Sequence, residues 1–285
     1  DVLLETHADG PWSSQTSVPY LEWRINAYKG DWQVPASGYR MLMAALRERT
    51  SPPDVRLWAG QISRVIETPP NANDQWLAEL VSKSAPARTL LLIKSWATSG
   101  PPDYRMTDEA ATLIGKAHER GFYVMVPIYV QHARSDWAAA RNMQRARLQR
   151  AQDVGPPNTL CMNPGSEAWR RALIAALRDT FGGARPDALL LPDAHVAVVD
   201  ADRATRVNGT RGLPRLLDEL QAAFPDMVLG AEGLNEIILP HIRFCRQPRP
   251  GVGTNHPITD FLFGRSVIWF QEQSAVPADS AERKN

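Results

Sequence analysis

Two carboxylates that follow short apolar runs are the candidates for chemistry in this chain. Glu232 comes directly after 228–231, and Asp193 follows 189–191 with Pro192 in between. In a (β/α)8 barrel, functional side chains lie at the carboxyl ends of the strands, because the loops there converge on one open face. Hydrolysis of a glycosidic bond uses two carboxyl groups, one as acid and the other as nucleophile or base. We therefore predict that Glu232 and Asp193 form a catalytic pair.

Other polar and aromatic side chains follow further apolar runs, and we expect them to contact the substrate at the same face. Lys94 lies within an apolar run, so it should have a carboxylate partner and either orient an acid or anchor substrate. The predicted substrate-contacting residues are Lys94, Trp96, Asp103, Tyr104, Tyr129, Gln131, His132, Asn163, His195, Asn235 and Glu236. The structural alternatives are loop packing for Trp96, Asp103 and Tyr104, and a carboxylate at a helix N-terminus for Glu236.

Apolar runs alternate with stretches of helical periodicity, which predicts an α/β fold with a parallel sheet covered by helices. Strands are expected at 55–66, 89–94, 122–130, 188–191 and 228–231, with late apolar runs at 258–263 and 267–270. Helices are expected at 36–49, 73–84, 107–120, 137–152, 166–181, 212–224 and 236–245. No strand precedes a Gly-x-Gly-x-x-Gly motif and no Gly-x4-Gly-Lys-Ser/Thr motif occurs, which weakens nucleotide-binding interpretations.

Short strands and irregular loops favour a (β/α)8 TIM-type barrel over a doubly wound sheet. About six strands are recognisable where eight close a barrel, so either two escape detection or the barrel is incomplete. We expect an entry segment of strands and a linking helix at 1–50, the barrel at 51–275 and a polar tail at 276–285. The chain begins in strand-like sequence, as a mature or excised fragment would.

The composition excludes several classes of partner. The 285 residues are 44% hydrophobic and carry a net charge of +1, so no global field favours nucleic acid. The arginines between 134 and 150 are interpreted as a solvated helix face. No run approaches the ~18 apolar residues of a membrane span. We predict a carbohydrate partner without nucleic acid or membrane, and leave the oligomeric state open.

No cofactor or metal is predicted. Asp193, His195 and Glu232 have no recognised ligand spacing, and the two cysteines form no disulfide framework. A non-hydrolytic barrel of the metal or aldolase type that uses Lys94 is a weaker third interpretation.

Several stretches together resemble a family of bacterial glycoside-hydrolase-like barrel proteins, which are distantly similar to α-galactosidase and endo-α-N-acetylgalactosaminidase barrels. The resembling stretches lie in order at 23–32 with Ala36 and 39–40, Trp96 with 102–104, 118–122, 161–164 with 169–170, 187–188, 208–209 with Gly212, and 231–236.

The resemblance implies that 1–35 holds the last strands of a β-sandwich. We also expect the protein to be secreted or periplasmic. The resemblance also implies a nucleophilic aspartate at the end of the fourth strand and an acid, Glu232, at the end of the fifth. Pro192 stands where that aspartate is expected, and a slip of one residue moves a strand side chain to the opposite face. Two interpretations follow: a glycoside hydrolase that uses Asp193 and Glu232, or a catalytically degenerate barrel that binds carbohydrate or is structural.

Overall fold

The computed structural model describes residues 29–50, 57–148, 156–196, 209–246, 258–264, 266–271 and 273–274. The strands expected within 1–28 and the tail 276–285 lie outside the described residues.

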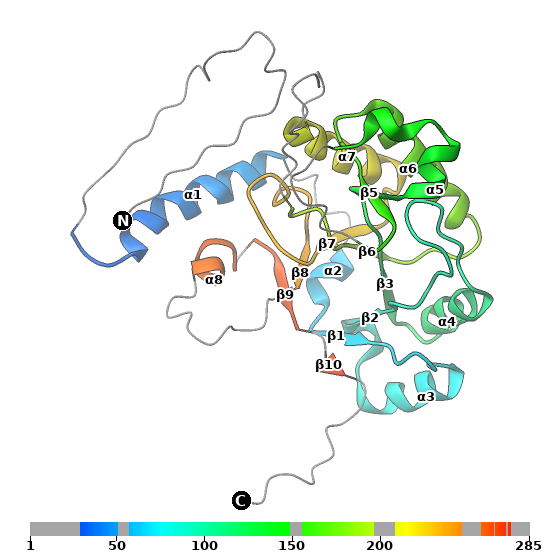
Figure 1. The fold of residues 1–285 in the computed structure, drawn as a ribbon. Helices are drawn as coiled ribbons and strands as arrows, with labels where there is room; N and C mark the ends of the chain where they lie inside the picture. Colours follow the sequence, from blue (N-terminus) through cyan, green and yellow to red (C-terminus); the bar gives the residue numbers. More distant parts are fainter. Residues whose placement is uncertain are drawn as a thin grey trace, which may run out of the picture.

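One parallel sheet forms the centre of the molecule (Figure 1). Its strands are β1 (Arg64–Glu67), β2 (Thr89–Leu92), β3 (Tyr123–Pro127), β6 (Ala188–Leu191), β7 (Val228–Ala231), β8 (Phe244–Arg246), β9 (Ile268–Phe270) and β10 (Gln273–Ser274). The order is β10-β1-β2-β3-β6-β7-β8-β9, and every neighbouring pair is parallel.

The two edge strands of this sheet are successive pieces of one short segment. β9 pairs with β8, whereas β10 pairs with β1. The segment 268–274 therefore spans from one edge of the sheet to the other. Within the described residues the sheet is a nearly closed barrel with seven strand positions, which confirms an incomplete (β/α) TIM-type barrel.

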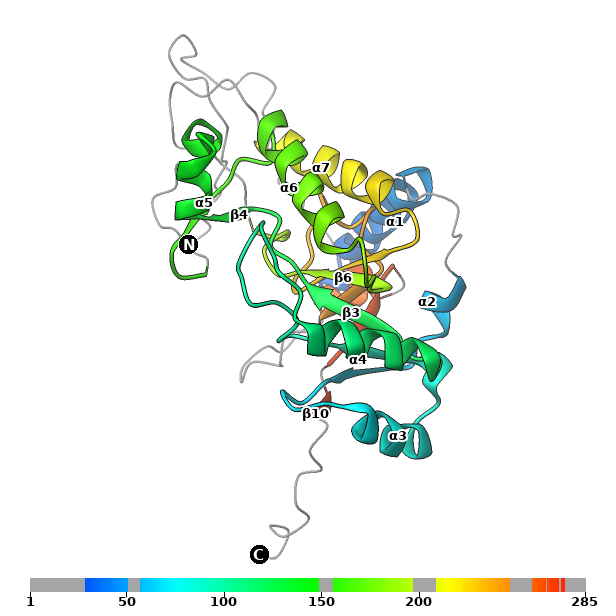
Figure 2. The ribbon, with the colours of Figure 1, turned by 90° about the vertical axis from the view of Figure 1, so that its right-hand side faces the viewer.

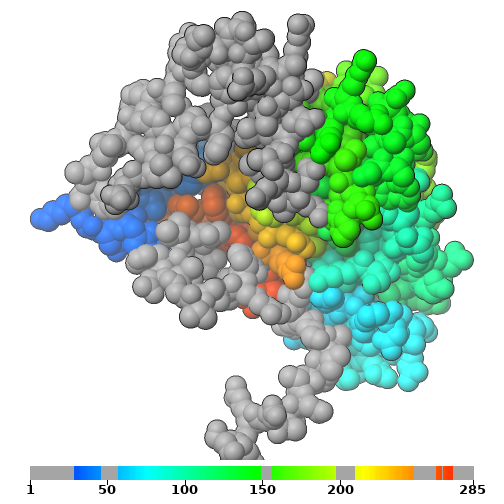
Figure 3. Space-filling view, in the orientation of Figure 1, coloured from blue at the N-terminus to red at the C-terminus, as the bar shows by residue number. Residues whose placement is uncertain are grey.

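Helices cover the outside of the barrel. The helices α3 (Asp74–Lys83), α4 (Asp108–Glu119), α6 (Glu167–Thr180) and α7 (Gly209–Ala223) each lie between consecutive barrel strands in the chain. Figure 2 faces α4, which packs on β3, and shows α6 and α7 beside it. The helices α1 (Gln33–Thr50) and α8 (Ile258–Phe263) lie together on the opposite side (Figure 1). In the space-filling view the segments from α3 to α6 form one continuous surface (Figure 3).

Local sequence signals explain where the outer helices begin and end. Asn73 accepts a hydrogen bond from the backbone N–H of Trp76, and Thr107 caps α4 in the same way. Such side-chain acceptors satisfy backbone donors that have no partner within the first turn. Gly121 follows α4 with a φ of +81°, a conformation that glycine adopts without steric cost. The predicted positions of these helices are confirmed.

Alternate residues of each strand face opposite sides of the barrel wall. One buried cluster fills the interior and includes Val65, Leu90, Leu92, Met125, Ala188, Leu190, Val228, Phe244 and Phe270. The intervening residues, such as Ile66, Leu91, Leu189 and Leu229, belong to a second cluster that packs against the helices. Trp58 of α2 (Leu57–Gln61) belongs with the interior cluster and stacks on Tyr123 at 4.1 Å, at the amino-terminal end of β3.

Three secondary-structure predictions were wrong in part. The expected strand at 55–66 contains α2, and only 64–67 pairs in the sheet. The expected helix at 236–245 is a series of turns followed by β8, because 244–246 pairs with both neighbouring strands. The expected helix at 137–152 is divided into α5 (Ser135–Ala140) and η2 (Met143–Ala146), since Asn142 between them has a φ of 55°.

A small two-stranded sheet beyond β3 was not predicted. It consists of β4 (His132–Arg134) and β5 (Thr159–Cys161), which pair antiparallel outside the barrel. A short 3-10 helix, η1 (Pro86–Arg88), precedes β2. None of the described helices combines the length and the apolar composition that crossing a membrane requires.

Candidate active site at the carboxyl ends of the strands

The alternation of the strands defines which side chains enter the open end of the barrel. Past the last inward residue of the interior cluster, or past Gly230 on β7, the next inward positions are Glu67, Lys94, Pro192, Glu232 and Arg246. On β3, where Pro127 takes that position, Tyr129 follows two residues later. Gly230 confirms the direction on β7, because a Cβ there would lie 3.2 Å from Cβ of Phe244 and 3.6 Å from Sδ of Met125. We call these six inward positions the mouth layer.

Glu232 forms an ion pair in this layer. Its Oε1 lies 3.1 Å from Nη1 of Arg246, and the two side chains are 30% and 35% exposed. Arg246 ends the neighbouring strand β8. Sequence reasoning missed Arg246, because 236–245 was interpreted as a helix rather than as the approach to a strand.

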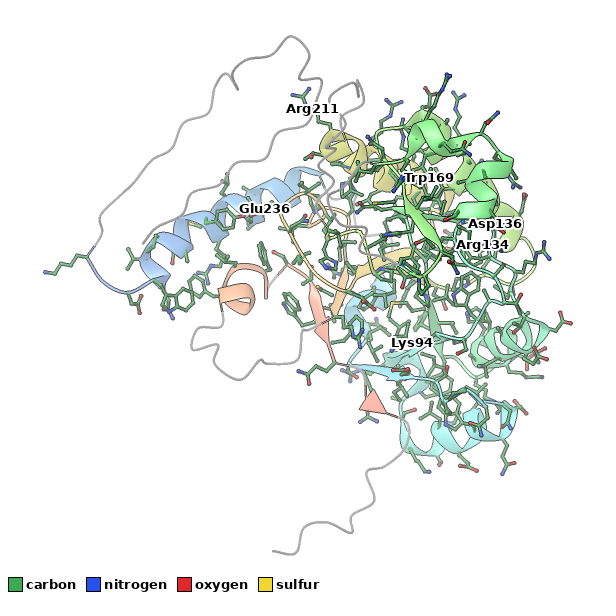
Figure 4. All side chains as sticks on the ribbon, in the orientation of Figure 1. Lys94, Arg134, Asp136, Trp169, Arg211 and Glu236 are labelled. Carbon is green, nitrogen blue, oxygen red and sulfur yellow. The ribbon has the colours of Figure 1, made fainter. Side chains whose placement is uncertain are left out.

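Glu67 and Lys94 form a second ion pair on another part of the same layer. Nζ of Lys94 lies 2.9 Å from Oε2 of Glu67, and the side chains are 38% and 35% exposed. The expected carboxylate partner of Lys94 is therefore Glu67, at the end of the adjacent strand β1. Lys94 is not buried, since β2 ends at Leu92 and the lysine lies beyond it, beside the sheet (Figure 4). Sequence reasoning also missed Glu67, whose signal was its place at the end of a short apolar run.

Asp193 lies in the turn that follows β6, and its carboxylate is directed at the loop after β3. It continues the outward alternation of Leu189 and Leu191, whereas Pro192 takes the inward position. The Asp193 residue is 3% exposed, and its carboxylate accepts hydrogen bonds from the backbone N–H groups of Val130 and Gln131 at 3.0 and 2.7 Å. Both carboxylate oxygens therefore bind the loop that follows β3.

His132 and Gln131 complete the surroundings of Asp193. Nδ1 of His132 lies 2.8 Å from Oδ2 of Asp193, and both side chains are buried. The Gln131 amide donates to the backbone carbonyls of Asp193 and Val196. The structure thus brings Gln131, His132 and Asp193 together, but as one buried hydrogen-bonded network.

Tyr129 connects this network to Glu232 electrostatically. Burial raises the pKa of the Tyr129 hydroxyl, and the negative charges of Asp193 and Glu232 raise it further. The hydroxyl of Tyr104 accepts a hydrogen bond from the backbone N–H of Tyr129 at 2.7 Å, and burial raises the pKa of Tyr104 as well. Tyr129 is therefore near enough to both Asp193 and Glu232 for its hydroxyl to be affected by each charge.

The loops after β6 and β7 are in direct contact. A Cβ on Gly233 would lie 2.6 Å from Cδ2 of His195, and the Asn235 amide donates to the His195 carbonyl at 3.0 Å. Among the described residues, the buried Nδ1 of His195 has no hydrogen-bond partner. The Asn235 side chain also accepts from the N–H groups of Ile237 and Ile238, which closes a single turn.

Three predicted contact residues serve packing or local turns. Trp96 is buried, donates to the Pro127 carbonyl at 3.0 Å and stacks on Phe181. Tyr104 packs against Trp96. Asn163 is buried and accepts from the N–H of Gly165 within its own turn.

Two other predicted residues lie in different surroundings. Asp103 lines a hollow of 550 Å³ between the β2–α4 loop, α5 and α6. Glu236 accepts a hydrogen bond from the hydroxyl of Tyr39 on α1, and it lies beside that helix in Figure 4. Glu236 begins no helix, so the dipole interpretation was wrong. Across the described ranges, no group of three or more His, Cys, Asp or Glu residues is arranged to hold a metal ion.

No family model matches the chain, and no curated protein matches its sequence. Solved structures do share its fold. An α-N-acetylgalactosaminidase from Bifidobacterium bifidum superposes with a TM-score of 0.60 at 14% identity, over 84% of this chain and 48% of that one. The GH36 α-galactosidase AgaB from Geobacillus stearothermophilus gives 0.56 at 13% identity, over 82% and 36%.

An α-galactosidase from Thermus thermophilus, in complex with p-nitrophenyl α-D-galactopyranoside, gives a TM-score of 0.52 at 15% identity, over 72% of this chain and 44% of that one. The chain therefore spans between about a third and a half of the length of these neighbours. In its fold the chain is a distant glycoside-hydrolase-like barrel, as the sequence resemblance implied.

Proposed function

We propose that this chain is a glycoside hydrolase-like protein that binds a carbohydrate at the mouth layer and uses Glu232 to protonate the leaving oxygen. The observation that carries the proposal is the inward alternation that places Glu232 beside Arg246 at the carboxyl ends of the strands. Functional groups of barrel enzymes occupy this end. The structural neighbours, which include galactosidases and an N-acetylgalactosaminidase, support a sugar as the ligand.

The mouth layer supplies suitable groups for sugar hydroxyls. Lys94 and Arg246 are donors, Glu67 and Glu232 are acceptors, and Tyr129 adds an aromatic face with a hydroxyl. Sites for small ligands combine apolar walls with a few convergent polar groups, and the interior cluster below the layer forms such a floor.

Asp193 enters this proposal as a positioning residue. Its carboxylate binds two backbone N–H groups and His132, so it fixes the loop that carries Tyr129. That it serves as the second carboxylate stays a prediction, which Asp193→Asn tests by its effect on kcat relative to its effect on stability.

The decisive measurement is turnover of a panel of aryl glycosides and natural glycans by the wild type and by Glu232→Gln. Removal of a general acid should lower kcat by about 10²- to 10⁴-fold on substrates with poor leaving groups. Glu79→Gln is the matched control, since Glu79 is an exposed residue of α3 on the outside of the barrel. Equal turnover by Glu232→Gln and the wild type would refute the role of Glu232.

A second candidate function is carbohydrate binding without cleavage. Pro192 favours it, because the inward position at the end of the fourth barrel strand then has no carboxylate. In that case calorimetry would detect glycan binding that Arg246→Met weakens, while no member of the panel would be hydrolysed.

A further inference from the structure

We infer that the hollow between the β2–α4 loop, α5 and α6 is a second carbohydrate site, which binds a neutral oligosaccharide on the outside of the barrel. Its volume of 550 Å³ lies within the range of about 300–1,000 Å³ that is usual for small-ligand sites. Among the described residues that line it, none belongs to the mouth layer, so the two sites are separate. The inference rests on the proposed function for the class of ligand, whereas binding here requires no cleavage.

The charged side chains around the hollow balance one another. Two carboxylates, Asp103 and Asp179, line it together with the guanidinium groups of Arg105 and Arg141. Over the described residues, the lining therefore carries no net charge. A cleft with charge of one sign concentrates ligands of the opposite sign, whereas a balanced one favours neither anions nor cations. The hollow therefore suits a ligand that is polar but neutral.

These charged groups are not engaged with one another. Within the described part of the chain, Asp103, Arg105 and Asp179 form no side-chain hydrogen bond or ion pair. Arg134, a further cation on which the charge of Asp103 acts, is bound to Asp136, and the two lie together in Figure 4. A hydroxyl group both donates and accepts hydrogen bonds. The neighbouring hydroxyls of a sugar can therefore bind carboxylate and guanidinium groups around the same hollow.

The backbone that forms one wall of the hollow is held in place. The three successive carbonyl groups at 103–105 accept hydrogen bonds from the hydroxyls of Ser99 and Thr180 and from the N–H of Thr98. Thr180 belongs to α6, so its hydroxyl also ties this loop to the helix. Groups that are ordered before binding lose little conformational entropy when a ligand arrives. The charged side chains on this wall are therefore presented from a fixed backbone.

Apolar side chains supply surface for the ring faces of a sugar. Cζ of Arg141 lies 4.7 Å from the ring centroid of Trp137, which holds this cation at the exposed rim. Trp137 and Met106 line the hollow, and α6 contributes the short side chains of Ala172 and Ala176. Short side chains leave room for a ligand. Apolar walls combined with a few convergent polar groups are typical of small-molecule sites.

Tyr104 connects the hollow to the mouth layer. It lines the hollow, and its hydroxyl accepts a hydrogen bond from the backbone N–H of Tyr129 at 2.7 Å. Binding at the mouth can therefore disturb the hollow through this side chain. A test of the hollow needs variants of both sites for this reason.

NMR titration of the nitrogen-15-labelled full chain measures binding at the hollow, with the indole N–H signal of Trp137 as the reporter. Trp137→Phe assigns that signal by its disappearance. The probes are three neutral oligosaccharides, raffinose, maltotriose and N,N′-diacetylchitobiose, and diglycine as a zwitterion. We expect at least one of the oligosaccharides to shift the signal saturably at millimolar concentration, and diglycine to leave it unshifted.

Arg141→Ala and Asp179→Ala should each weaken this binding by about 10-fold, since each removes a charged hydrogen-bonding partner. Both residues are exposed, so thermal unfolding of the two variants should match that of the wild type. Arg178→Ala is the matched control, because Arg178 is the exposed neighbour of Asp179 on α6 but lines the groove beside α7. Glu232→Gln should leave the titration of the Trp137 signal unchanged.

Three outcomes would each overturn the inference: no shift with any of the oligosaccharides, equal affinities in Arg141→Ala, Asp179→Ala and Arg178→Ala, or a shift that Glu232→Gln abolishes. The last outcome would mean that the sugar binds only at the mouth and acts through Tyr104. A shift with diglycine alone would assign the hollow to a peptide instead of a sugar. Turnover of the glycoside panel reports separately on the proposed function, so either can fail while the other stands.

Discussion

Gly233 lies against the imidazole ring of His195, so that a Cβ on Gly233 would come 2.6 Å from Cδ2 and 2.7 Å from Cγ. This contact joins the loop that follows β7, which carries Glu232, to the loop that follows β6. The backbone at His195 is held by the Asn235 amide, which donates to the His195 carbonyl at 3.0 Å.

Gly233→Ala should therefore destabilise the protein by about 1–3 kcal/mol, the usual cost of overpacking. Denaturant unfolding measures this cost. Gly183→Ala is the control, because a Cβ at Gly183 has no neighbouring atom within 4 Å. Equal free energies of unfolding for the two variants would contradict the contact.

Asp193→Ala should lower the free energy of unfolding by about 2–5 kcal/mol, because it leaves two buried backbone N–H groups without acceptors. The same substitution at Asp226, an exposed residue, should change the free energy of unfolding by less than about 0.5 kcal/mol. A small effect of Asp193→Ala would mean that the loop after β3 does not depend on this carboxylate.

His118 and His241 should make the free energy of unfolding depend on pH, and the two effects should have opposite signs. The hydrogen bond to Asp187 raises the pKa of His118. The contribution of His118 to the free energy of unfolding is therefore complete below its unfolded pKa of about 6.5. It is lost as the pH rises through the higher pKa that His118 has in the folded protein. Burial lowers the pKa of His241, so below pH of about 6.5 the unfolded chain takes up a proton that the folded protein does not, and stability falls.

Urea unfolding between pH 5 and 8 separates the two effects. His118→Gln should lose stability more steeply than the wild type as the pH falls, because the favourable protonation at His118 is gone. His241→Gln should lose less stability on acidification than the wild type. The same pH dependence in all three proteins would rule out both assignments.

Both cysteines are buried, and burial raises the pKa of the Cys245 thiol to about 12. The thiolate is the reactive species, so native protein should react with Ellman's reagent only through unfolding. Denatured protein should release two equivalents, and Cys245→Ala should release one. Rapid reaction of the native protein at pH 8 would show that β8 opens readily.

Sequence patterns predicted most of the elements around the site because their signals are local. The caps Asn73 and Thr107 start their helices as expected, and the apolar runs at 188–191 and 228–231 are β6 and β7. For the apolar run at 267–270, local sequence signals could not predict its position in the sheet. Its role in spanning the two edges of the sheet depends on the pairing of 268–270 with β8 and of 273–274 with β1, more than 200 residues earlier in the chain.

The sequence by itself determined that Glu232 ends an apolar strand and that Lys94 needs a charged partner, and the family resemblance added that Pro192 stands where a carboxylate is expected. Only the tertiary structure decided that Glu67 is that partner, that Arg246 pairs with Glu232 and that Asp193 binds the loop after β3. The reason is geometric: a strand fixes the alternation of its own side chains, whereas closure of the barrel determines which face is inside and which distant strand ends meet there.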